Sequence, residues 1–75
     1  TDYKEAIKWY KKAAEQGSPE AQLNLGVAFI SGSGVPEDLS KASYWTMKAY
    51  ENPEASATIQ ELAEDNWNTF ELWNY

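Results

Sequence analysis

An internal repeat organises this chain of 75 residues. Six residues recur in the same order at a constant offset of 36 positions: Asp2, Ala6, Trp9, Lys12, Ala13 and Glu15 return as Asp38, Ala42, Trp45, Lys48, Ala49 and Glu51. A fixed period in this range is typical of stacked repeat proteins, in which each unit buries its apolar side against its neighbours. Because such arrays present an extended surface, the period favours a binding scaffold over a closed catalytic pocket.

Apolar residues three and four positions apart predict two amphipathic helices in the first part of the chain. The first covers about residues 2–16 and begins at a capping box formed by Asp2 and Glu5. A glycine and a serine then separate it from the second helix, which starts with Pro19 and runs to about Ser31.

A turn rich in glycine, serine and proline, residues 31–36, predicts a tight connection to a third helix beginning near Glu37 or Asp38. Asn52 and Pro53 repeat the combination of cap and proline that opens the second helix, so they are expected to open a fourth. The apolar positions of that fourth helix are Ala55, Ile59, Leu62 and Ala63. No stretch alternates as a strand does, and the predicted fold is therefore all-α.

Two kinds of residue are interpreted as packing residues. Trp9 and Trp45 occupy matched repeat positions, which favours core or inter-repeat packing over the stacking of a ligand. Gly26 stands within a helix, where glycine costs about 1 kcal/mol relative to alanine. We expect that two helices approach each other closely at this glycine.

The composition excludes most kinds of catalytic and metal-binding site. The chain contains neither cysteine nor histidine, so thiolate nucleophiles, imidazole bases and the commonest zinc ligands are absent. Glu61, Glu64 and Asp65 could form a weak cation site, but a solvated acidic face is the favoured interpretation because no calcium-loop spacing accompanies them. No catalytic residue, cofactor or metal ligand is predicted.

The charge pattern argues against polyanionic partners. The formal net charge is -6, arginine is absent, and four of the six lysines lie in the first 17 residues. An acidic chain without the bidentate phosphate-binding residue is a poor candidate for nucleic acid or anionic membrane. No apolar run approaches membrane-spanning length, so direct membrane insertion is not predicted either.

The middle of the chain carries a family resemblance. An alanine-rich helix, a Gly-x-Gly-Val-Pro turn and a helix with a tryptophan follow one another at residues 21–30, 32–38 and 41–45. This succession resembles the Sel-1-like repeat (SLR), and residues 8–17 look like the end of a preceding unit. The resemblance implies a right-handed solenoid of α/α helix pairs, related to tetratricopeptide repeats.

The resemblance also implies a domain organisation, with about two repeats cut out of phase within residues 1–64. Its parts are residues 2–16 as the second helix of a preceding repeat, 19–52 as a complete repeat and 53–64 as the start of a further one. The fourth helix lacks the Leu25-Gly26 centre of the second, and the pattern stops after Glu64. We therefore expect the C-terminal end of an array, with residues 65–75 as an aromatic capping tail.

The second helix has two apolar stripes, of which one suffices to build a repeat core. The resemblance implies that one stripe packs inside the helix pair and that the other looks toward a concave face. We hypothesise that the second stripe, with polar flanks, lines a partner groove; the alternative is that it packs on adjacent repeats. The stripe and its flanks are Leu23, Val27, Ile30, Glu20, Asn24 and Ser31.

The last eleven residues are rich in aromatic side chains. Trp67, Phe70 and Trp73 recur every third position, which one side of a helix would bring together. Large apolar side chains seldom stay exposed without cause. Three interpretations remain open: the tail caps the end of the solenoid, it anchors a partner or a second copy, or it is disordered.

The function that these observations favour is a non-enzymatic adaptor that holds a protein or peptide on a concave or terminal helical surface. The alternative is a structural cap of a longer array with no partner site of its own. Self-association through the unpaired first helix or the aromatic tail also remains open. An enzyme would need a carboxylate or lysine site that no spacing supports. The resemblance implies, without choosing, a bacterial exported or periplasmic location or the eukaryotic secretory pathway.

Overall fold

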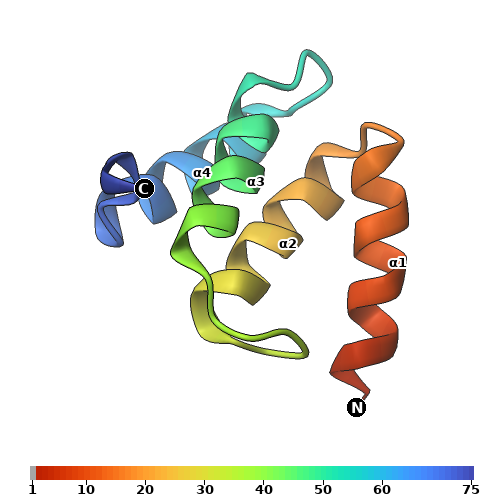
Figure 1. Cartoon of the computed structure of the whole chain (residues 1–75). Helices are drawn as coiled ribbons and strands as arrows, with labels where there is room; N and C mark the ends of the chain where they lie inside the picture. The colour runs from red at the N-terminus through yellow and green to blue at the C-terminus, as the bar shows by residue number, and fades with distance from the viewer. Residues whose placement is uncertain (1) are drawn as a thin grey trace.

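The computed structural model describes residues 2–75. Within this range the chain forms four α-helices of 13 residues each and a short 3-10 helix. These are α1 Tyr3–Glu15, α2 Pro19–Ser31, α3 Leu39–Glu51, α4 Ala57–Thr69 and η1 Leu72–Asn74. Figure 1 shows α2 lying between α1 and α3. No strand occurs in residues 2–75, and the prediction of an all-α fold is confirmed.

Each α-helix begins at a side-chain cap, and the cap type alternates along the chain. The first and third helices are capped by aspartate, the second and fourth by serine, each accepting a hydrogen bond from the amide three residues later. The caps are Asp2, Ser18, Asp38 and Ser56, with acceptor-to-nitrogen distances between 3.1 and 3.3 Å. The repeat is therefore visible in the local structure as well as in the sequence.

The start of α4 differs from the sequence-based expectation. Asn52 does not cap this helix; it ends α3, and its Oδ1 accepts a hydrogen bond from the amide of Glu54 at 2.9 Å. Such a bond to the backbone two residues ahead stabilises a turn rather than a helix start. Pro53 lies in that turn, and α4 begins at Ala57 with Ser56 as its cap.

The end of α4 also lies beyond the expected boundary. The helix continues past Glu64 to Thr69, so five residues of the expected tail are helical. Phe70 then ends the helix, and Glu71 takes a left-handed backbone conformation with φ 51°. This reversal turns η1 back onto α3 and α4.

The core centres on α2, which buries seven of its 13 residues. One core cluster joins α1, α2, α3 and η1, and includes the fully buried Leu25, Ala42 and Leu72. A second cluster joins α2, α3 and α4 through Leu23, Ala49 and Ala63. Since small alanines supply much of both clusters, the helices lie close together rather than being held apart by large side chains.

Gly26 lies at a close contact between α2 and α3. A Cβ atom at this position would lie 2.6 Å from Thr46 Oγ1 and 3.5 Å from the carbonyl oxygen of Ala42. The first distance is shorter than van der Waals contact allows. The predicted packing role of Gly26 is therefore confirmed.

The α2–α3 loop contains a second close contact, made by Gly34. This residue has φ 80°, and a Cβ atom on it would lie 2.7 Å from the carbonyl oxygen of Tyr3 and 2.9 Å from the side chain of Ile7. Glycine therefore serves two purposes here, because a side chain would be strained by the backbone conformation and would also collide with α1.

Candidate partner-binding surfaces

Leu23, the first residue of the predicted groove on α2, is buried. It packs with Ala49 and Ala63, and Ile59 of α4 lies against the same cluster. The expectation that Leu23 lines an open groove is therefore corrected. The physical reason is that α4 covers this side of α2, so this part of the second stripe serves inter-helix packing.

The rest of the predicted stripe is divided between different environments. Val27 is 43% exposed and lines a shallow hollow between α1 and α2, together with its predicted flanks Asn24 and Ser31. Ile30 is half-buried against the core, and Glu20 is exposed but does not line this hollow. The stripe therefore does not form one continuous surface. The hollow is completed by Tyr3, Ala6, Ile7, Tyr10, Ala28 and Ser33.

The three aromatic residues of the tail do not share one side either. Trp67 is half-buried and packs against the core, whereas Phe70 and Trp73 are exposed. The left-handed turn at Glu71 breaks the three-residue spacing and directs Leu72 inward, where it is fully buried. Leu72, which the sequence pattern did not single out, thus attaches the tail to the core.

The matched tryptophans of the repeat have unequal surroundings. Trp45 packs against the core cluster that contains Phe29 of α2, the helix preceding α3. Trp9 is 64% exposed, with the Lys12 ammonium 6.0 Å from its ring centroid. The expectation of a packing role for Trp9 is not met within residues 2–75.

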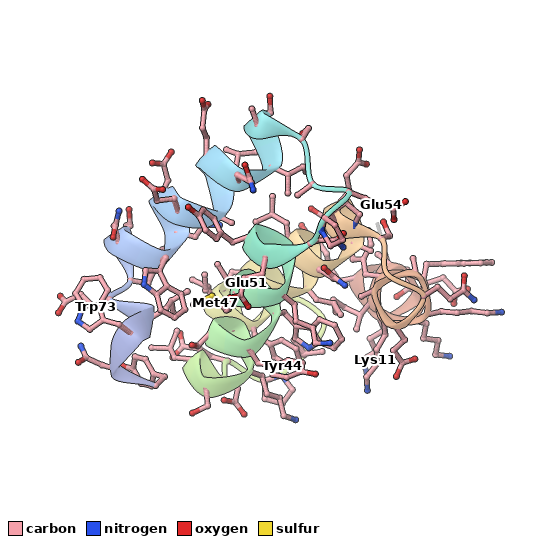
Figure 2. The ribbon with its side chains drawn as sticks, turned by 90° about the horizontal axis from the view of Figure 1, so that it is seen from above. Lys11, Tyr44, Met47, Glu51, Glu54 and Trp73 are labelled. Atoms are coloured by element: carbon pink, nitrogen blue, oxygen red, sulfur yellow. The ribbon has the colours of Figure 1, made fainter. Side chains whose placement is uncertain are left out.

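A groove of about 250 Å³ lies between α3 and α4 and has mainly apolar walls. Its lining residues are Thr46, Met47, Tyr50, Glu51, Ala63, Glu64 and Trp67. Figure 2 shows Met47 and Glu51 on the part of α3 nearer to α4, whereas Tyr44 points away from it. Phe70 and Trp73, which follow α4, are exposed but do not line this groove.

Met47 and Tyr50 were missed by sequence reasoning, although a signal was present. They are three residues apart and therefore lie on one face of α3. Met47 and Tyr50 form a second apolar face of α3, and this face lines the groove.

The groove lies in a strongly acidic part of the molecule. Beyond Lys48 the chain contains six acidic residues and neither lysine nor arginine. These are Glu51, Glu54, Glu61, Glu64, Asp65 and Glu71. Two of them, Glu51 and Glu64, belong to the groove lining. A cationic or basic ligand is therefore favoured over an anionic one at this surface.

The described residues hold no arrangement suited to metal chemistry. In residues 2–75 no three acidic side chains lie close enough together to hold a metal ion, and this includes Glu61, Glu64 and Asp65. In the same part of the chain, the helices are too short or too polar to cross a membrane. The surfaces described above can contribute apolar contact, hydrogen bonds and negative charge.

Several known proteins are similar to this chain. A family model described as Sel1 repeat matches residues 1–18 and 19–53. A segment of 41 residues, 55% of the chain, is 46% identical to the Rattus norvegicus and Mus musculus proteins named DAP3-binding cell death enhancer 1. A segment of 61 residues, 79% of the chain, is 39% identical to the chitin synthase regulator SKT5 of Malassezia restricta. No solved structure matches the chain significantly.

The similar segments are small parts of these relatives, covering 8% of each cell death enhancer and 4% of the chitin synthase regulator. The family match, in contrast, covers more than half of this chain. Helical hairpins stacked as in tetratricopeptide solenoids are the architecture of Sel1 repeats, and the four helices agree with it. The sequence motif, the paired helices and the family match together show that the chain belongs to the Sel1 repeat family.

Proposed function

We propose that this chain is a non-catalytic scaffold that holds a protein or peptide partner against its helical surface. Sel1 repeats typically mediate protein–protein interaction and are generally non-catalytic. The observation that carries the proposal for this chain is the open, mainly apolar groove between α3 and α4. A contiguous apolar surface rimmed by polar residues is typical of an interaction site.

The names of the relatives agree with this class of function. One group is named for binding a protein and for enhancing cell death, and the other for regulating chitin synthase. Those activities belong to proteins of which the matched segment is a small part. For this chain we propose only the general role of a binding module.

A purely structural role is the second candidate, and Leu72 favours it. Its side chain is fully buried, so the tail closes part of the core between α3 and α4. A cap of this kind protects the end of a stack from solvent. The two roles are compatible, because no residue of η1 lines the open groove between α3 and α4.

Selection of peptides from a random displayed library on the folded chain tests the scaffold proposal. Two variants separate the surfaces: Met47→Glu in the α3–α4 groove and Val27→Asp in the α1–α2 hollow. We expect enriched peptides to lose binding to Met47→Glu and to retain it on Val27→Asp, with circular dichroism showing that both variants are folded. Failure to enrich any peptide would contradict the scaffold role and favour the structural cap.

A further inference from the structure

We propose that the groove between α3 and α4 receives a basic amphipathic helix of a partner protein, lying across α4 as α3 lies across α2. This inference rests on the scaffold function proposed above and specifies the partner class. It is argued from the register of α4 against α2, the groove that borders the matching face of α4, and the charge around that groove. On this face Ala63 is buried, Trp67 is half-buried and Glu64 is exposed.

The register follows from two repeated structural features. The serine caps Ser18 and Ser56 open helices of equal length, 38 residues apart. Four residues after each cap, a glutamine side chain donates a hydrogen bond to a carbonyl near the end of the preceding helix. The two bonds run from Gln22 Nε2 to Ala14 O at 3.1 Å and from Gln60 Nε2 to Tyr50 O at 3.2 Å. The α3–α4 junction thus repeats the α1–α2 junction.

With this register, the α4 residues in the groove match the face of α2 that α3 covers. Ala63, Glu64 and Trp67 correspond to Leu25, Gly26 and Phe29. On α2 this face packs against α3, with Gly26 directly opposite Thr46. On α4 the same face borders an open groove. A helix is therefore the shape that the fold already accommodates at this position, and helix-in-groove docking is a common mode of peptide recognition.

The main difference between the two faces determines the chemistry of the occupant. Glu64 of α4 occupies the position that corresponds to Gly26 of α2. A carboxylate side chain therefore stands where α2 has no side chain and allows close helix contact. Glu51 lines the groove from α3. Lys48 lines a separate hollow with Glu51, but it does not line the groove, and its ammonium lies 5.4 Å from the ring centroid of Tyr44. No basic residue follows Lys48 in the chain. A partner helix would therefore place apolar side chains against Met47 and Trp67 and basic side chains beside the two glutamates.

Two synthetic amphipathic peptides of about 14 residues, roughly four helical turns, are suitable probes. Both have the same leucine stripe, but one has lysine and the other glutamate on its polar face. We expect fluorescence anisotropy to show binding of the lysine peptide alone, weakening as salt is raised. Glu64→Lys or Glu51→Lys should each weaken that binding about tenfold or more, which corresponds to roughly 1.4 kcal/mol. Glu20→Lys, an exposed charge reversal on α2 outside the groove, is the matched control.

Four results would overturn the inference. Equal binding of both peptides would remove the charge argument, and equal weakening by Glu20→Lys would show general attraction to an acidic protein. Concentration-dependent self-association, measured by light scattering and abolished by Glu64→Lys, would identify a second copy as the occupant, since α1 is itself rich in lysine. If library peptides bind but avoid basic sequences or the groove, the scaffold function stands and this partner class is wrong.

Discussion

The side-chain amide of Asn52 donates a hydrogen bond to Gln22 Oε1 at 3.1 Å, joining the end of α3 to the start of α2. The same nitrogen lies 2.8 Å from the carbonyl oxygen of Gly17, and Gln22 in turn donates to the carbonyl of Ala14. Two amide side chains therefore connect the end of α3 to the α1–α2 junction, 30 to 35 residues earlier in the sequence. Because Gln22 is buried, its polar groups depend on these partners.

The first prediction concerns this network. Gln22→Ala should lower the free energy of unfolding by about 1–3 kcal/mol, because the Ala14 carbonyl and the Asn52 amide lose a buried partner. Gln60→Ala removes the corresponding bond to Tyr50 at an exposed position and should cost below about 1 kcal/mol. Urea denaturation followed by circular dichroism measures both. Equal losses would show that burial of the network contributes little.

The second prediction concerns the contact at Gly26. Gly26→Ala should destabilise the chain by about 1–3 kcal/mol, because the added methyl group collides with the stiff side chain of Thr46. This cost should exceed the gain in helix propensity of up to about 1 kcal/mol. In a Thr46→Ala background the same substitution should cost less, and a double-mutant cycle measures the coupling. An identical cost in both backgrounds would exclude the proposed collision.

A third prediction separates the buried and exposed residues of the tail. Leu72→Ala should cost about 2–5 kcal/mol, since it leaves a cavity in a core that small alanines cannot fill. Trp73→Ala, one residue later and 53% exposed, should change stability by roughly 0.5 kcal/mol or less. Thermal unfolding monitored at 222 nm, the usual helix wavelength, compares the two. A larger loss from Trp73→Ala would show that the tail is attached differently.

The repeated tryptophans provide a fourth, internally matched prediction. Trp45→Ala should destabilise the chain by about 2 kcal/mol or more, because it removes an aromatic side chain packed against the core. Trp9→Ala should cost at most about 1 kcal/mol, the size of its exposed contact with Lys12. Denaturant midpoints of the two variants give the comparison. Similar losses would contradict the unequal burial of the two positions.

The features that sequence reasoning captured are those with local causes. Helix spacing, glycine stops and the caps at Asp2 and Ser18 all depend on residues within a few positions of one another, and the structure has them. The start of α4 was misplaced because Asn52 has a long-range role. Its hydrogen bonds reach residues 30 and 35 positions away, which no local pattern reveals.

The candidate site was less predictable because it depends on how helices cover one another. Leu23 and Val27 belong to one sequence stripe, yet α4 buries the first and leaves the second exposed. Phe70 and Trp73 lost their common face because Glu71 adopts a positive φ, which is uncommon for a residue with a side chain. In the first case the cause is a tertiary contact and in the second a backbone reversal, whereas the sequence pattern describes only a continuous, isolated helix.

Gly34 has a consequence for the geometry of the whole stack. The angle between successive helix pairs is small at each junction, but it accumulates along a solenoid and determines its curvature. In this chain the α2–α3 loop touches the backbone of α1 at a point where even a methyl group would be too large. A side chain at this one loop position, which lies outside the α3–α4 groove, would therefore push α1 away from the α2–α3 loop and change the angle between α1 and the helices that follow it.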